Sequence, residues 1–174
     1  MSEPESEKTL QIYDAFLQGG QVFFPKASEL MEIRERGFGY LRGKKLVLTP
    51  LEGFYLLEKG RINVQDKGRN KITFERLVKR LTGKKAEIWV KYLVYRDLRD
   101  RGYLVRECPR FDFEIHGKGP VRRYISIVYE GREADLKTLI KLLKRSTTEK
   151  KELILAVVDR RTDIVYYTLE FLRV

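Results

Sequence analysis

Two side chains have types that could take part in proton transfer or anion binding: His116, the only histidine of the chain, and Lys151, which precedes an apolar run. An imidazole can accept or donate a proton near neutral pH, and an ammonium group can stabilise charge that builds on a phosphate. Concerted proton transfer needs a group at both the attacking and the leaving oxygen. His116 is therefore either half of an acid–base pair or an ordinary loop histidine, and Lys151 either a phosphate contact or a solvated lysine.

Carboxylates near these residues suggest a different chemistry. Asp112, Glu114 and the pair Glu149 and Lys151 are loosely similar to the sites of metal-dependent nucleases. Their spacing is poor for a metal site, and carboxylates that alternate with aromatic residues on a strand usually form its solvent-facing side. We rank this interpretation last and expect neither a metal nor a cofactor.

Basic residues are concentrated in the same part of the chain. Six basic residues face a single acid between Lys137 and Lys151, and the whole chain has a formal net charge of +11. Lysines and arginines that neutralise phosphates release counterions, so this balance favours a polyanionic partner. A well-charged solvated surface is the alternative. The candidates for contact with the phosphates of such a partner are Arg122, Arg123, Lys144, Arg145 and Lys150.

The composition indicates a reducing compartment. The single cysteine, Cys108, cannot form an internal disulfide. No apolar run approaches the ~20 residues of a membrane span. The acidic start MSEPESEK lacks the basic-then-apolar order of a signal peptide. We expect a cytoplasmic protein without membrane contact.

The length of 174 residues and the hydrophobic content of 43% allow one domain or two small ones. We predict an N-terminal α/β domain over residues 1–83 and a second domain over 84–174. In the first, a short helix or irregular segment is expected at 9–18, a helix at 27–35, and strands within 39–48 and 62–64. Thr49, Pro50 and Glu52 form a capping box that begins a helix. Another helix is expected at 73–81. No catalytic triad, metal set or phosphate loop stands out in this half.

Hydrophobic periodicity predicts a mixed sheet flanked by helices in the second domain. Helices are expected at 86–101 and 135–145. The apolar run 153–158 has the length and composition of a central strand. Further strands are expected at 103–106, 111–115, 122–129 and 164–172. The fold class is α/β, with α+β mixed character.

Several sequence blocks carry a resemblance to a known family. They are YLVYRDLRDRGYLV at 92–105, DF at 112–113, Tyr124, KELILAVVDRRTDIVYY at 151–167 and VLTPLEGFYLLEKGRINV at 47–64. Together they cover most of residues 37–174 and resemble archaeal tRNA-splicing endonuclease subunits. The resemblance implies cleavage of precursor tRNA without a metal, leaving a 2′,3′-cyclic phosphate and a 5′-OH.

The resemblance also implies three catalytic positions. A tyrosine closing a DFxxY motif acts as base, a histidine opening an HSxY motif acts as acid, and a lysine holds the charge on the phosphate. The matching positions here are His116, Val121 and Lys151. One position in three is retained, and valine cannot donate a proton. We therefore predict a structural, non-cutting subunit, with an active metal-independent endonuclease as the alternative.

Some enzymes of this family combine two catalytic and two structural subunits, which implies a catalytic homologue as partner. The loop at 129–135 lies at the position of the family's acidic loop, which docks into a basic pocket of the opposing subunit. It can equally be a solvated helix start. The aromatic final strand suits pairing with a partner strand. The expected interface residues are Glu130, Glu133, Asp135, Tyr166, Tyr167 and Phe171.

Overall fold

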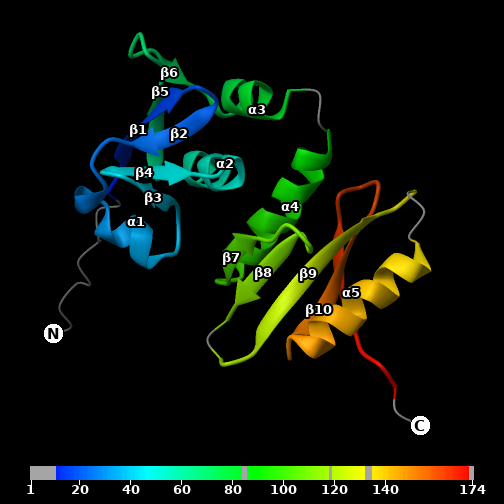
Figure 1. Cartoon of the computed structure of the whole chain (residues 1–174). Coiled ribbons are helices and arrows are strands. Elements are labelled where there is room, and N and C mark those ends of the chain that lie inside the picture. The colour runs from blue at the N-terminus through cyan, green and yellow to red at the C-terminus, as the bar shows by residue number, and fades with distance from the viewer. Residues whose placement is uncertain (1–10, 84–85, 118, 132–134, 173–174) are drawn as a thin grey trace, which may run out of the picture. The chain divides into compact units, whose positions relative to one another are not determined.

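The computed structural model describes residues 11–83, 86–117, 119–131 and 135–172. The chain divides into two compact units, residues 1–83 and 84–174. Each unit contains one sheet with parallel and antiparallel neighbours, together with its own helices (Figure 1). The predicted mixed α/β class is confirmed.

The first unit is built on a six-stranded sheet of order β3-β4-β2-β1-β5-β6. Its strands are β1 Tyr13–Gln18, β2 Gln21–Phe24, β3 Tyr40–Arg42, β4 Lys45–Leu48, β5 Ile62–Gln65 and β6 Lys71–Ile72. Its helices are η1 Ala27–Glu29, α1 Met31–Glu35, α2 Pro50–Glu58 and α3 Phe74–Thr82. Strand β1 runs parallel to β5, whereas the other neighbours are antiparallel.

Two local predictions in this unit need correction. The segment expected as a helix or irregular segment at 9–18 contains strand β1, in which Ala15 and Leu17 are buried at a spacing of two. Its pairing with β5, far along the chain, decides this conformation. The helix expected at 27–35 is split at Leu30 into η1 and α1.

The capping box at the start of α2 is confirmed. The Thr49 hydroxyl accepts a hydrogen bond from the Glu52 amide at 3.4 Å, and the Glu52 carboxylate accepts one from the Thr49 amide at 2.8 Å. The other Glu52 oxygen accepts from the Gly39 amide at 3.1 Å, which ties the loop before β3 to the helix. A Cβ atom at Gly53 would lie 3.4 Å from a Val22 methyl group, so α2 packs closely on β2.

The second unit has a five-stranded sheet of order β11-β10-β9-β8-β7. Its strands are β7 Leu104–Glu107, β8 Phe113–His116, β9 Arg122–Tyr129, β10 Glu152–Val158 and β11 Ile164–Leu169, and its helices are α4 Ala86–Asp100 and α5 Leu136–Thr148. The predicted internal strand is confirmed, because β10 lies between β9 and β11 with Leu153, Ala156 and Val158 fully buried. Strand β11 ends at Leu169, earlier than predicted, so Phe171 lies beyond it.

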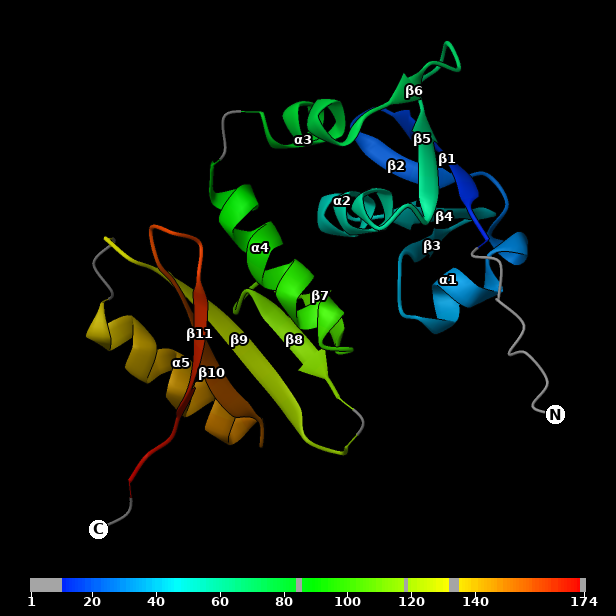
Figure 2. The same ribbon diagram turned by 180° about the vertical axis from the view of Figure 1, so that it is seen from behind.

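The helices α4 and α5 cover opposite faces of this sheet (Figures 1 and 2). Phe113, which contacts Tyr95 of α4 at a ring distance of 5.9 Å, alternates with Glu114 and therefore points to the α4 face. Tyr124 and Leu153 pack with Leu143 of α5 on the other face. Among the helices that the structure describes, none has the length and apolar character to cross a membrane.

Candidate functional site

Three strands bring the predicted catalytic residues together on the α5 face of the second sheet. The antiparallel register of β8 and β9 places Glu114 opposite Tyr124. The parallel register of β9 and β10 places Leu153 next to Tyr124. His116 follows Glu114 by two residues and Lys151 precedes Leu153 by two. Side chains two residues apart on a strand share a face, so the four polar side chains converge.

The turn at the C-terminal end of α5 fixes the position of Lys151. The Lys151 amide donates to the Ser146 carbonyl at 2.9 Å, and the Lys150 amide donates to the Thr147 carbonyl at 3.1 Å. Together with a left-handed Lys150 at φ 54°, these bonds form a Schellman motif. The chain therefore turns from α5 into β10 over three residues, which directs the Lys151 side chain onto the face beneath α5.

The Lys151 ammonium group is held inside a network of hydrogen bonds. Its Nζ donates to Glu114 Oε1 at 2.8 Å and to the Tyr124 hydroxyl at 2.7 Å. The Tyr124 hydroxyl in turn donates to the Glu149 carboxylate. Glu149 also accepts from Arg145 Nε at 2.9 Å. Charge-assisted bonds of this kind are stronger than neutral ones, so the network couples β8, β9, β10 and the end of α5.

The protonation states follow from these contacts. Burial, with the bond to Glu149, raises the pKa of the Tyr124 hydroxyl, whose ring is stacked on Phe111 at 3.9 Å. Burial alone would lower the pKa of Lys151, but the bonds to Glu114 and Tyr124 outweigh it and raise the pKa. The hydrogen bond from Tyr124 lowers the pKa of Glu149. At neutral pH Tyr124 is therefore a neutral donor between two charged groups.

The other two positions that the resemblance predicts as catalytic lie in the turn region between β8 and β9. His116 ends β8, and its Nε2 lies 3.4 Å from Glu114 Oε1, the same oxygen that accepts from Lys151. Val121, which directly precedes β9, is 42% exposed and carries no ionisable group. Glu114 thus neutralises the ammonium group that would have to meet a phosphate. The site offers one imidazole, with a hydrophobic side chain at the position expected for the proton donor.

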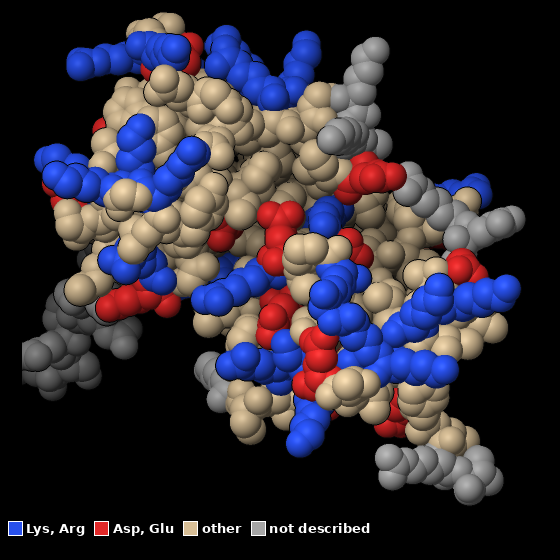
Figure 3. Space-filling view, in the orientation of Figure 1, with Lys and Arg blue, Asp and Glu red and all other residues tan. Residues whose placement is uncertain are grey.

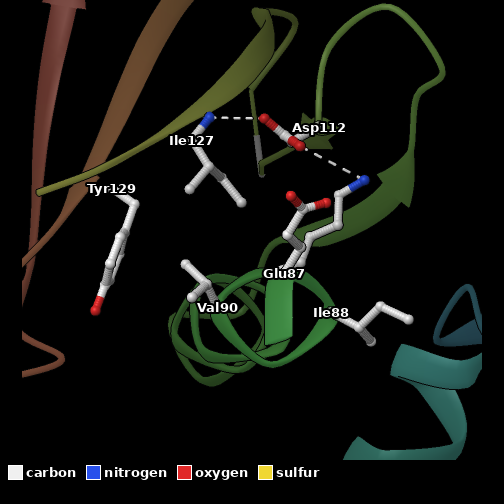
Figure 4. Close-up of a pocket in the computed structure, with 7 residues that line it drawn as sticks. Glu87, Ile88, Val90, Asp112, Ile127 and Tyr129 are labelled. Carbon is white, nitrogen blue, oxygen red and sulfur yellow. Dashed lines mark hydrogen bonds and ion pairs between the residues drawn. The ribbon is translucent and has the colours of Figure 1, made fainter. Parts of the chain in front are cut away.

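Asp112 is separated from the other two carboxylates of the metal-dependent alternative, which both belong to the network around Lys151. Asp112 Oδ2 accepts from the Ile127 amide at 2.7 Å, and Asp112 Oδ1 lies 3.5 Å from Lys91 Nζ of α4 (Figure 4). Glu114 instead faces Lys151. The hollow of about 460 Å³ next to Asp112 is lined on the other side by residues of α4. Within the described parts of the chain, no group of three or more His, Cys, Asp and Glu side chains is placed to hold a metal ion.

The residues predicted to contact RNA are not all on one face. Arg122 is exposed and lies opposite His116 in the strand pair. Arg123 points to the other face, where its Nε lies 2.6 Å from Glu152 Oε2. Arg145 is engaged by Glu149, whereas Lys144 and Lys150 are exposed. Figure 3 shows acidic side chains between the basic ones over this unit.

Two of the three predicted acidic interface residues accept hydrogen bonds from amides of their own unit. Asp135 caps α5 by accepting from the amides of Lys137 at 3.1 Å and Thr138 at 3.2 Å. The Thr138 hydroxyl, which also donates to this carboxylate, is the main reason for its lowered pKa. Glu130 accepts from the Arg160 amide at 3.1 Å. Glu133 lies outside the described residues.

The predicted aromatic interface residues also differ from one another. The Tyr166 hydroxyl donates to Asp97 of α4 at 2.7 Å, and burial raises its pKa. Tyr167 and Phe171 are 55% and 47% exposed. Tyr166 is thus satisfied within its own unit, whereas the other two aromatic side chains remain open.

Glu114 and Glu149 were not predicted from the sequence as partners of Lys151 and Tyr124. Their roles depend on the register of three strands and on the turn after α5. The available signal was the cross-strand position of Glu114 opposite Tyr124, which appears once the segments around them are aligned as an antiparallel pair.

Comparison with known proteins assigns both units to one family. Residues 13–78 match the tRNA intron endonuclease, N-terminal domain, and residues 88–166 match the tRNA intron endonuclease, catalytic C-terminal domain. A tRNA-splicing endonuclease of Pyrococcus abyssi is 31% identical over 168 residues, covering 94% of this chain and 98% of the relative. One of Pyrococcus furiosus is 33% identical over 165 residues, covering 92% and 96%. The chain belongs to the tRNA intron endonuclease family, whose activity is the removal of introns from tRNA.

Proposed function

We propose that the chain is the structural, non-cutting subunit of a tRNA-splicing endonuclease. It assembles with a catalytic homologue, two copies of each, and helps to position precursor tRNA. The observation that carries this proposal is the state of the three catalytic positions. They hold His116, Val121 and a Lys151 whose ammonium group is already bonded to Glu114 and Tyr124.

Proton transfer is the weakest point of this site as an enzyme. Cleavage by a ribose hydroxyl needs a base for the attacking oxygen and an acid for the leaving oxygen. His116 can serve one end, but Val121 leaves the other without a donor. Tyr124 is an unsuitable substitute, because it is 5% exposed and its raised pKa keeps its proton on the hydroxyl directed at Glu149.

One observation favours the alternative of an active, metal-independent endonuclease. His116 and Glu114 approach within 3.4 Å, and a carboxylate can orient an imidazole and stabilise its charged form. In that case His116 would act as acid or base and Lys151 would leave Glu114 to meet the phosphate. The products would be a 2′,3′-cyclic phosphate and a 5′-OH.

A partner strand is supported by the exposed edge of the second sheet. Strand β11 has β10 on one side and none on the other within the described sheet. Val165 and Tyr167 are 49% and 55% exposed. On α5, Leu136 and Ile140 are 68% and 38% exposed. An exposed edge with apolar side chains favours association, and we assign this surface to the catalytic homologue.

The experiment is cleavage of precursor tRNA by the purified chain in EDTA, with and without a catalytic homologue. We expect no products from the chain alone and cleavage only in the mixture. Products bearing a 2′,3′-cyclic phosphate from the chain alone would overturn the proposal and favour the active alternative. Cleavage by the chain alone that requires added Mg²⁺ would favour the metal-dependent one.

A further inference from the structure

The first unit carries a strongly cationic surface to which the sequence analysis assigned no chemistry. It extends from the β5–β6 loop over the outer face of α3, and Figure 3 shows lysine and arginine side chains gathered there, along the upper edge of the view. All of its cationic side chains are exposed. They are Lys67, Arg69, Lys71, Arg76, Lys79 and Arg80, which we call the α3 surface.

Within the described residues, none of the six cations of the α3 surface forms a salt bridge. Residues 66–82 contain two acids, Asp66 and Glu75. Asp66 accepts hydrogen bonds from the amides of Asn70 at 3.0 Å and Gly68 at 2.9 Å, and the bond from Asn70 is the main cause of its lowered pKa. Glu75 lies in the first turn of α3, where its own backbone amide lowers its pKa. Both acids therefore serve local backbone structure, although Asp66 offsets part of the charge of Arg80.

A hollow of about 380 Å³ opens at one end of this surface. The β1–β2 turn, the β5–β6 loop and α3 line it, with Lys67 and Arg80 as its cations and Asp66, which is bonded to backbone amides, as its acid. In the turn, Gly19 and Gly20 have left-handed φ values of 59° and 74°, and a Cβ atom on either would meet no atom within 4 Å. The backbone is therefore open to a compact ligand, and a lysine and an arginine suit a phosphate group.

We propose that the α3 surface binds the sugar–phosphate backbone of precursor tRNA, with one phosphate seated in the hollow beside Lys67 and Arg80. This rests on the proposed function, because it takes precursor tRNA as the ligand of the complex. Phosphates that replace the counterions of six free cations give binding that depends steeply on salt.

The character of the surface favours RNA over an acidic protein. Protein interfaces have a core enriched in aromatic and other apolar side chains. None of the large hydrophobic side chains that are exposed in the described part of the first unit lies on the β5–β6 loop or α3; they are Ile12, Met31, Tyr40 and Leu41. A surface with six exposed cations, whose two acids are engaged by backbone amides, matches phosphates.

The test compares two triple variants of the full chain. R76A/K79A/R80A removes three cations from α3, where alanine preserves the helix. K26A/R34A/K59A removes three exposed cations of the same unit from other elements and is the control. Binding of fluorescent precursor tRNA is measured by anisotropy across a series of KCl concentrations. We expect the α3 variant to bind at least about tenfold more weakly, and its slope of log K against log salt to fall by about 2, since each phosphate contributes about 0.7–0.9. The control should stay within about twofold of wild type.

The results distinguish an error in the α3 surface assignment from an error in the proposed function. If wild type binds precursor tRNA and the α3 variant matches the control in affinity and slope, this surface assignment is wrong and the proposed function stands. If wild type, alone and with the catalytic homologue, does not bind precursor tRNA, both are wrong. Normal RNA affinity with lost binding of the catalytic homologue would make the α3 surface a protein interface, which also overturns the inference.

Discussion

Two cationic regions of this chain look alike in sequence and differ in structure. Residues 137–151 and 66–82 each contain six basic residues, with one and two acids respectively. Around the second sheet, carboxylates engage Lys151, Arg145 and Arg123. On the α3 surface the cations are free of ion pairs with the described residues. Basic density alone therefore does not locate a phosphate site, because the fold decides which cations are already neutralised.

This difference separates two uses of a positive charge. A partly buried lysine with two bonded partners, such as Lys151, stabilises the packing of strands and helix. An exposed, unpaired cation adds little to stability and is available for a phosphate. We therefore expect paired cations to affect unfolding, and free cations to affect RNA binding.

The largest expected effect concerns two adjacent tyrosines. Like the two groups of cations, one has a hydrogen-bond partner within the chain and the other is exposed. Because Tyr167 is exposed on the edge strand, Y167D should weaken association with the catalytic homologue by at least about 100-fold, as for an interface hot spot. Because Tyr166 is bonded to Asp97, Y166F should instead lower the free energy of unfolding by about 1–2 kcal/mol and leave association unchanged. Isothermal titration calorimetry measures association with the catalytic homologue, and urea unfolding measures the free energy of unfolding. Equal effects of both changes on association would contradict this division.

Replacing Lys151 and replacing Lys79 should have different effects on the free energy of unfolding. K151M leaves Glu114 and Tyr124 without their shared donor and should lower the free energy of unfolding by about 2 kcal/mol. K79M removes an exposed, unpaired charge and should change it by less than about 0.5 kcal/mol. Urea unfolding at pH 7 measures both. A K151M variant as stable as K79M would show that the network contributes nothing to the fold.

The stability of the network should also depend on pH in a defined direction. The lowered pKa of Glu149 gives a contribution that is present above its ordinary value of 4.5 and is lost as pH falls through the lowered value. The raised pKa values of Tyr124 and Lys151 give contributions that are present below 10.0 and 10.5 and are lost as pH rises through the raised values. The stability difference between wild type and Y124F should therefore be constant from about pH 5 to 9 and shrink outside that range. Urea unfolding across pH tests this, and a difference that changes steadily between pH 5 and 9 would contradict it.

The smallest effect is the release of a paired cation. E152Q removes the carboxylate that engages Arg123 and should strengthen precursor tRNA binding by about two- to threefold, since one more cation becomes available. E107Q makes the same charge change at an exposed position of β7 and is the control. Anisotropy titrations of the two variants should differ. Identical curves would mean that freeing Arg123 adds no RNA contact.

The sequence predicted well those features that local chemistry determines. The capping box of α2 and the alternation of β9 were found because their signals lie within a few residues. Strand β1 was missed because its conformation depends on pairing with β5, which a short apolar segment does not reveal. At the candidate site, the positions of His116 and Lys151 were visible. The neutralisation of Lys151 by Glu114 was not, since it requires the registers of β8, β9 and β10.

Under the proposed function, this chain contributes no catalytic group to the complex. An inactive isolated chain would be an ambiguous result, because it could simply lack its partner. The decisive measurement is therefore the single-turnover cleavage rate of precursor tRNA in EDTA by the complex reconstituted with the catalytic homologue, comparing wild type with H116A of this chain. We predict rates equal within about twofold. A fall of about 100-fold or more, the size expected for loss of a general acid or base, would show that His116 is catalytic and that this chain is not purely structural.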